Sequence, residues 1–253
     1  RLYWRAVKTP SENYHSYIHL IDSTGNAIYH SDPLPGPWFR PPQGWDTYYL
    51  QQDTHVLEIP ANAPGGLYWP SVGLYEIRQM NRMAITVDGQ PVPGDVLRLP
   101  PIKVVGAPAT PPQRLTARFD AGFELLGYAL DLPPEGLHPG TQFAVTLYYR
   151  STAATATDYT RFFHLYSPEL SLAAQADSPP QAGVNPTWAW VPGETIIDTV
   201  TLQVADNAAP GEYRLFTGFY DAQAGGVRLG VQDENDQALP DGGVVLETVT
   251  VQP

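Results

Sequence analysis

The chain has 253 residues with 27 prolines, 22 glycines and no cysteine, and its 26 acidic residues outnumber its 14 basic ones, giving a net charge of −12. This charge opposes binding to phosphate backbones, so nucleic acid is not an expected partner. The lack of cysteine excludes disulfides and thiolate metal sites, and the lack of a long apolar run argues against direct membrane insertion by this chain.

Short apolar runs between turn residues predict strands throughout the chain, and no window has a convincing helical period. In the first half the expected strands are 2–6, 14–22, 27–32, 53–59, 66–76, 84–87 and 96–104. In the second half they are 124–131, 142–151, 159–166, 172–177, 196–204, 211–221 and 244–251. Seven short strands per half, with Pro-Gly turns between them, predict all-β, antiparallel sandwiches of the immunoglobulin-like or jelly-roll-like kind.

The two halves are related by an internal repeat. His19 aligns with His164, since 164 − 19 = 145, and Gly73 aligns with Gly218 at the same spacing. The register holds without a gap from Leu2 to Tyr75, with nineteen identical pairs, which is several times the number expected by chance. The offset grows to 147 near the end of each half. A repeat of this length indicates the duplication of a whole domain rather than a solenoid unit.

We therefore expect a first β-sandwich at 1–105, a Pro-rich linker at 106–113 and a second β-sandwich at 114–253. The second repeat has residues 123–145 before its Leu-Tyr-Tyr-Arg strand, whereas the first opens directly at Leu-Tyr-Trp-Arg. The first sandwich is thus predicted to lack its N-terminal strand or strands, to have an open or irregular sheet edge, and to continue upstream in the natural protein.

Several motifs together resemble a known module. They are Phe-Glu-Leu-Leu-Gly-Tyr at 123–128, Leu-Tyr-Tyr-Arg at 147–150, Phe-His-Leu at 163–165, Trp-Val-Pro-Gly-Glu at 190–194 and Pro-Gly-Glu-Tyr-Arg-Leu at 210–215. This order resembles tandem repeats of bacterial envelope proteins that follow the membrane portion of dolichyl-phosphate-mannose mannosyltransferase-like glycosyltransferases. The resemblance implies an extracytoplasmic location in the cell envelope or periplasm, with tethering to a membrane by segments outside this chain. It also implies that any catalytic residues lie in that membrane portion.

Aromatic residues gather in the connection between the third and fourth strands of each half. Trp45 aligns with Trp190, and a shared position favours a structural plug at the end of each sandwich. Trp38, Phe39 and Trp188 are not shared in this way. Exposed aromatic rings stack on the apolar faces of sugars, so these three are the candidate ligand-binding residues, although burial beneath a Pro-rich loop is the structural alternative.

The acidic stretch with Asp233, Glu234 and Asp236 offers hard oxygen ligands and is a speculative calcium site, with a solvated hairpin tip as the favoured alternative. His19 and His164 are expected to be structural, bonded to neighbouring strands.

Tyr68 and Tyr213 resemble a tyrosine corner, in which a buried ring sends its hydroxyl to a backbone group. Arg150 is expected to pair with a carboxylate such as Asp177, or to cover apolar surface with its stem.

No catalytic motif or cofactor fingerprint is present. The expected function is a non-catalytic extracytoplasmic β-sandwich module, acting as a spacer, a scaffold or a weak carbohydrate-recognition unit of a larger membrane-associated, glycosyltransferase-like protein. The alternative is a stand-alone carbohydrate-binding or adhesion protein, and an enzyme comes third. A glycan or cell-envelope polysaccharide is the expected partner, no cofactor is expected, and the oligomeric state stays open.

Overall fold

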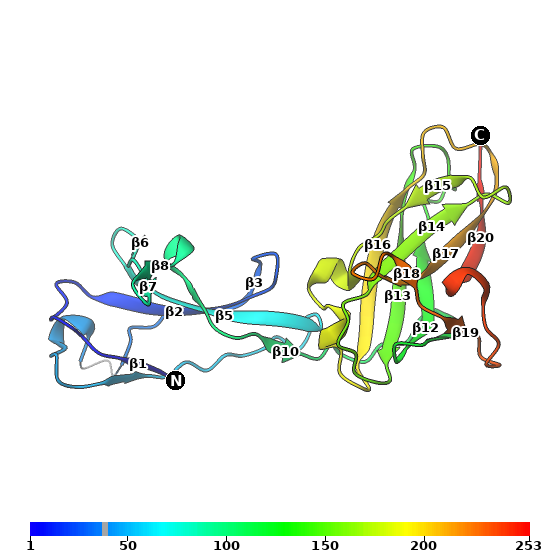
Figure 1. The fold of residues 1–253 in the computed structure, drawn as a ribbon. Helices are drawn as coiled ribbons and strands as arrows, with labels where there is room; N and C mark the ends of the chain where they lie inside the picture. The colour runs from blue at the N-terminus through cyan, green and yellow to red at the C-terminus, as the bar shows by residue number, and fades with distance from the viewer. Residues whose placement is uncertain (37–39) are drawn as a thin grey trace. The chain divides into compact units, whose positions relative to one another are not determined.

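The computed structural model describes residues 1–36 and 40–253, and strands dominate it (Figure 1). The described residues form no α-helix and only short 3-10 turns, so the all-β prediction is confirmed. Two compact units are present. Unit 1 comprises Arg1–Ala63 with Leu67–Val104, and unit 2 comprises Pro64–Gly66 with Val105–Pro253.

Unit 2 is an antiparallel β-sandwich. One sheet has the order β16-β13-β12-β11-β19, which are Thr195–Gln203, Gln142–Ser151, Phe123–Asp131, Gln113–Phe119 and Val231–Gln232. The other has the order β15-β14-β17-β18, with β20 also paired to β17, and these are Leu172–Gln175, Thr160–Tyr166, Gly211–Asp221, Val227–Arg228 and Gly243–Val251. Three 3-10 turns, η3 (Pro180–Gly183), η4 (Thr187–Ala189) and η5 (Pro240–Gly242), lie in the connections.

Aromatic rings from both sheets form the centre of the unit 2 core. The Phe123 and Phe219 ring centroids are 4.8 Å apart, and the Tyr149 and Phe219 centroids are 5.2 Å apart. Trp190 is buried beside them and donates Nε1–H to the carbonyl of Asn185 at 2.9 Å. Alternate residues of β13 face this core, which is the period of two that a strand with one buried face requires.

Unit 1 has one large sheet and two small ones. The large sheet has the order β10-β5-β2-β3, with β6 and β9 also paired to β5, and these are Ile102–Val104, Gly66–Glu76, Tyr14–Ile21, Ala27–Ser31, Asn81–Arg82 and Leu97–Arg98. One small sheet pairs β1 (Leu2–Trp4) with β4 (Gln51–Asp53), and the other pairs β7 (Thr86–Val87) with β8 (Gln90–Pro91). The 3-10 turns are η1 (Pro42–Gly44) and η2 (Pro93–Asp95).

The strand pairing of the two units agrees residue by residue at the offset read from the sequence. The corresponding partners are Leu2↔Asp53 with Leu147↔Asp198, His19↔Ser71 with His164↔Phe216, and Ser71↔Arg98 with Phe216↔Val245. The sheet that contains β13 has five strands, whereas its counterpart in unit 1 has two. Within the described residues β1 is paired only to β4, which is the open edge expected of the first sandwich.

A close approach of β2 to β5, and of β14 to β17, explains the glycines shared by the repeats. A Cβ on Gly73 would lie 2.3 Å from the Tyr17 hydroxyl oxygen, and a Cβ on Gly218 would lie 2.6 Å from the Phe162 ring. Positions 17 and 162 correspond at the same offset of 145 as positions 73 and 218. An aromatic ring therefore crosses the neighbouring strand at the same place in each unit, and only glycine leaves room for it.

The structure overturns one predicted strand and contains a long strand that was not predicted. The strand expected at 53–59 is wrong, because β4 ends at Asp53 and the exposed side chains of Val56 and Ile59 show that the following apolar residues face no core. The strand β11 (Gln113–Phe119) was not predicted, since it begins directly after the Pro-rich stretch and its apolar residues do not form one continuous run.

Candidate functional site

The candidate sugar-contact residues lie in the connections that follow β3 and β15. Trp38 and Phe39 are outside the described residues. Trp188 lies in η4 with 48% of its surface exposed. Its neighbour Thr187 ties the turn to the preceding loop by donating Oγ1–H to the carbonyl of Thr157 at 2.8 Å. Trp188 is thus an exposed ring on an anchored turn, and its role in binding stays a prediction.

The two tryptophans shared by the repeats are packed inside. Trp45 and Trp190 are both buried, and each donates its indole N–H to the carbonyl five residues before it, Arg40 at 3.0 Å and Asn185 at 2.9 Å. The expected plug at the end of each sandwich therefore has the same hydrogen bond in both units.

The acidic loop of unit 2 is held by its own backbone. Asp233 Oδ1 accepts hydrogen bonds from the backbone N–H groups of Asn235 and Gln237, both at 2.9 Å. These backbone bonds, that of Gln237 first, hold the pKa of Asp233 below its ordinary value. Asp236 forms an ion pair with Arg118. In the described part of the chain no three His, Cys, Asp or Glu side chains are placed to hold a metal ion, so the geometry fits the hairpin-tip alternative for Asp233, Glu234 and Asp236.

A serine, a histidine and an aspartate meet in unit 1, although not as a nucleophilic triad. Ser16 Oγ donates to Asp53 Oδ2 at 2.7 Å, and His55 Nε2 lies 3.0 Å from the same oxygen and 3.3 Å from Ser16 Oγ. One ring nitrogen therefore meets both partners, whereas a triad uses the two nitrogens separately. All three side chains are buried, so the cluster supports the fold and offers no exposed nucleophile.

The corresponding position in unit 2 carries a buried ion pair. Arg161 occupies the position of Ser16, and its Nε donates to Asp198 Oδ2 at 2.9 Å. The guanidinium also donates to the carbonyl of Ala176 and to Ser178 Oγ, each at 2.6 Å. Buried aspartates at equivalent positions in the two units are thus stabilised by different donors.

Histidines at equivalent positions bind aspartates across the strands. His19 Nε2 lies 3.3 Å from Asp32 Oδ1, and His164 Nε2 lies 3.2 Å from Asp177 Oδ1. Burial lowers the pKa of His164, and the nearby Asp177 opposes this effect. The prediction of structural histidines bonded to neighbouring strands agrees with this geometry. The prediction that Asp177 is the carboxylate partner of Arg150 was wrong. Arg150 instead pairs with Glu124 at 2.6 Å across β12 and β13.

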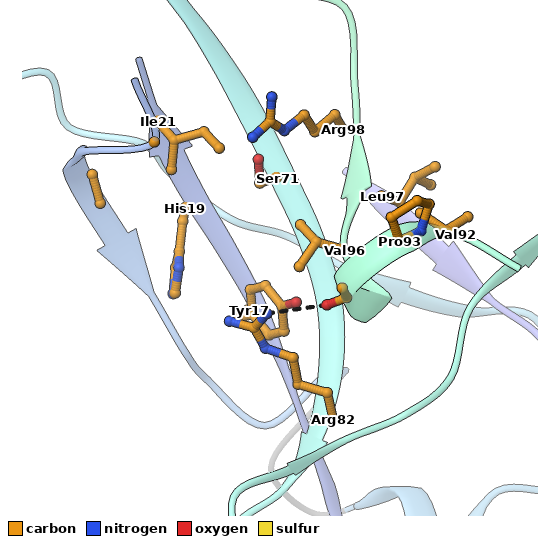
Figure 2. Close-up of a pocket in the computed structure, with 13 residues that line it drawn as sticks. Tyr17, His19, Ile21, Ser71, Arg82, Val92, Pro93, Val96, Leu97 and Arg98 are labelled. Carbon is orange, nitrogen blue, oxygen red and sulfur yellow. Dashed lines mark hydrogen bonds between the residues drawn. The ribbon is translucent and has the colours of Figure 1, made fainter. Parts of the chain in front are cut away.

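The face of the unit 1 sheet that carries His19 also bears a hollow of about 700 Å³ (Figure 2). Tyr17 and His19 of β2 and Ser71 of β5 lie along it, and the segment 92–98 forms its opposite wall. Figure 2 shows Arg98 and Arg82 at opposite ends of the hollow, with Ser71 between them. Its volume lies within the range of small-molecule binding pockets.

Two hydrogen bonds fix the wall of this hollow to the sheet. Tyr17 donates its hydroxyl to the carbonyl of Asp95 at 3.2 Å, and Arg82 donates to the carbonyl of Gly94 at 3.1 Å. The Arg82 guanidinium lies 5.5 Å from the centre of the Tyr17 ring. Burial raises the pKa of Tyr17, so the hydroxyl remains a neutral donor at physiological pH.

The matching face of unit 2 carries an aromatic ring and a smaller hollow of about 420 Å³. Phe216 stands where unit 1 has Ser71, and its ring centre is 5.5 Å from that of Phe162, the counterpart of Tyr17. The Arg228 guanidinium lies 4.4 Å from the centre of the Phe162 ring. Gly243, the counterpart of Val96, accommodates the Phe216 ring, because a Cβ there would lie 2.4 Å from that ring. The larger hollow of unit 1 thus coincides with the replacement of a phenylalanine by a serine.

Four residues characterise this hollow: Tyr17, Ser71, Arg82 and Arg98. None of them was predicted to be functional. A signal was present in the repeat, since Ser71 aligns with Phe216 beside the shared glycines. The aligned sequence marks the difference but does not show which face of the sheet the two side chains occupy.

No family model matches the chain, and no curated protein matches it. Within residues 1–36 and 40–253 no helix is long and apolar enough to cross a membrane.

Proposed function

We propose that the chain is a non-catalytic extracytoplasmic module of a larger membrane-associated, glycosyltransferase-like protein. In this proposal the repeats at 1–105 and 114–253 are joined by the linker 106–113. The second repeat is a structural platform, and the first repeat carries a carbohydrate-recognition site. The resemblance of the repeat motifs to envelope modules supports the location and the attachment. The geometry supports the division of roles between the repeats.

The observation that carries the recognition role is the hollow over β2 and β5. With Phe216 on this face the hollow of unit 2 measures about 420 Å³, whereas with Ser71 the hollow of unit 1 measures about 700 Å³. A serine here removes a large apolar contact, so the open face lacks the ring packing that stabilises its counterpart. Such a difference between otherwise corresponding faces fits a binding role better than a packing role.

The non-catalytic part of the proposal draws on the buried Ser16, Asp53 and His55 cluster. Its serine is wholly buried and shares one histidine nitrogen with the aspartate, so a substrate has no path to an activated nucleophile. This geometry supports the proposed roles of recognition and support.

A glycan-array screen of the chain tests the recognition role. The variant Ser71→Phe/Val96→Gly copies the filled face of unit 2 into unit 1, and the control Trp188→Ala removes the exposed ring of unit 2. The proposal predicts saturable glycan binding that the double variant loses and the control retains. Binding lost only in Trp188→Ala would move the site to η4, and no binding to any glycan would reduce the module to a spacer.

A further inference from the structure

The hollow of unit 1 is lined by cationic groups although the chain is rich in acids. The net charge is −12, yet Arg82 and Arg98 line this hollow, as Arg214 and Arg228 line the smaller hollow of unit 2. The lining of the unit 1 hollow is largely aliphatic and includes Ile21, Val92 and Val96. Cationic groups combined with an apolar wall select a ligand that has both an anionic group and an apolar face.

The carboxylates nearest to the hollow are already engaged. Asp32 is bonded to His19 at 3.3 Å, and Asp95 accepts a hydrogen bond from the backbone N–H of Ile85 at 3.3 Å. Among the residues that the structure describes, neither Arg82 nor Arg98 has an ion-pair partner. Both arginines are exposed, but Arg82 is held against Tyr17 and the carbonyl of Gly94, and Arg98 is therefore the guanidinium assigned to the ligand.

The position of unit 2 that corresponds to Arg98 has no cation. Val245 occupies it and pairs with Phe216, as Arg98 pairs with Ser71 in unit 1. Two differences between the units therefore occur at one cross-strand pair: an aromatic ring is replaced by a hydroxyl, and an aliphatic side chain is replaced by a guanidinium. The first coincides with a larger hollow, about 700 Å³ against about 420 Å³, and the second places a guanidinium at this cross-strand pair.

We propose that this hollow binds an acidic pyranose residue, a uronate of an acidic polysaccharide, with its carboxylate on Arg98 and its ring against the aliphatic wall. This proposal rests on the proposed carbohydrate-recognition function and names its ligand class. A guanidinium presents paired N–H donors that match a carboxylate, and this match separates a uronate from a neutral sugar. The His19 ring supplies a polar group for the sugar hydroxyls, whereas the buried Ser71 hydroxyl donates to the carbonyl of Trp69 and contributes by its small size.

Isothermal titration calorimetry of the full chain with oligogalacturonate, with the carboxyl-reduced form of the same oligosaccharide, and with inorganic phosphate tests the proposal. We expect the uronate to bind at least about tenfold more tightly than the reduced form, because one charge-assisted pair is lost on reduction. Inorganic phosphate is expected to bind more weakly than the uronate, since it has no ring to place against the aliphatic wall.

Two substitutions remove one positive charge each and differ only in place. Arg98→Gln is expected to weaken oligogalacturonate binding at least about tenfold, whereas Arg78→Gln, an exposed arginine outside the hollow, leaves it unchanged. The double variant Ser71→Phe/Val96→Gly is expected to abolish binding.

Each contrary result has a distinct meaning. Equal affinity for the uronate and its reduced form, with both lost in the double variant, would overturn the acidic-sugar proposal and keep the recognition function. Equal loss in Arg98→Gln and Arg78→Gln would show attraction to overall charge and would also overturn it. Phosphate binding as tightly as the uronate would replace the sugar with a simple anion. Failure of both oligosaccharides to bind, together with an empty glycan array, would overturn the recognition function as well.

Discussion

Removal of the buried cation of unit 2 should be among the most damaging single changes in the protein. The side chains of Arg161 and Asp198 are only 2% and 1% exposed, and they meet at 2.9 Å. In Arg161→Met the Asp198 carboxylate retains the backbone N–H of Gln181 at 2.8 Å but loses the guanidinium. Breaking a buried pair from one side costs about 3–5 kcal/mol of unfolding free energy, because a buried charge is left uncompensated.

Unit 1 supplies the matched comparison at the equivalent position. Ser16→Ala removes a neutral hydroxyl from Asp53, which keeps Trp4 Nε1–H at 3.1 Å and His55 Nε2 at 3.0 Å. The loss of one hydrogen bond with partners remaining costs about 1–3 kcal/mol at most. The charged variant is therefore expected to destabilise unit 2 more than the neutral variant destabilises unit 1.

Urea unfolding followed by tryptophan fluorescence and circular dichroism measures both effects. The double variant Arg161→Met/Asp198→Leu leaves no buried charge and should recover much of the stability lost in Arg161→Met. A loss below about 1 kcal/mol in Arg161→Met would refute the reasoning, since an uncompensated buried carboxylate cannot be that well tolerated. A double variant less stable than the single one would refute it too.

Three further outcomes are expected. Gly218→Ala should lower the unfolding free energy by about 1–3 kcal/mol, because the added Cβ overpacks against the Phe162 ring. The control Gly44→Ala, where a Cβ meets nothing within 4 Å, should lower it less, and urea unfolding of both variants measures the difference. Because burial lowers the pKa of His164 in the folded state, its contribution to stability is present above its unfolded pKa of about 6.5 and is lost as pH falls below it. The unfolding free energy measured between about pH 7.5 and pH 5.5 should thus fall more in the natural protein than in His164→Gln, and equal falls would contradict this. Burial, together with the nearby carboxylate of Glu247, raises the pKa of Tyr128 to about 12. Glu247→Gln should therefore lower this pKa in an ultraviolet titration, and an unchanged titration would argue against the contact.

Much of the fold followed from the sequence, because strands with one buried face have a period of two and turns use Pro and Gly. The strand predicted at 142–151 coincides with β13, and the strand at 211–221 coincides with β17. Residues 53–59 misled the prediction, since their apolar side chains have the same local pattern but no partner strand to bury them. Local pattern does not report tertiary pairing.

The candidate site was harder to predict than the fold. A hollow depends on which side chain is missing from a surface, and a missing ring leaves no motif in one sequence. Ser71 is unremarkable until strand pairing places it opposite Arg98 and beside His19. The shared Trp45 and Trp190, predicted as structural plugs, are buried in the structure, and the candidate Trp188 is exposed.

Ligand binding should belong to the larger hollow of unit 1 and not to its smaller counterpart in unit 2. Nuclear magnetic resonance titration of the isotope-labelled chain with oligogalacturonate tests this most directly. We expect shifts of the backbone signals of Tyr17, Ser71 and Arg98, with those of Phe162 and Phe216 unchanged. Shifts confined to residues 187–191, or equal shifts on both faces, would contradict it.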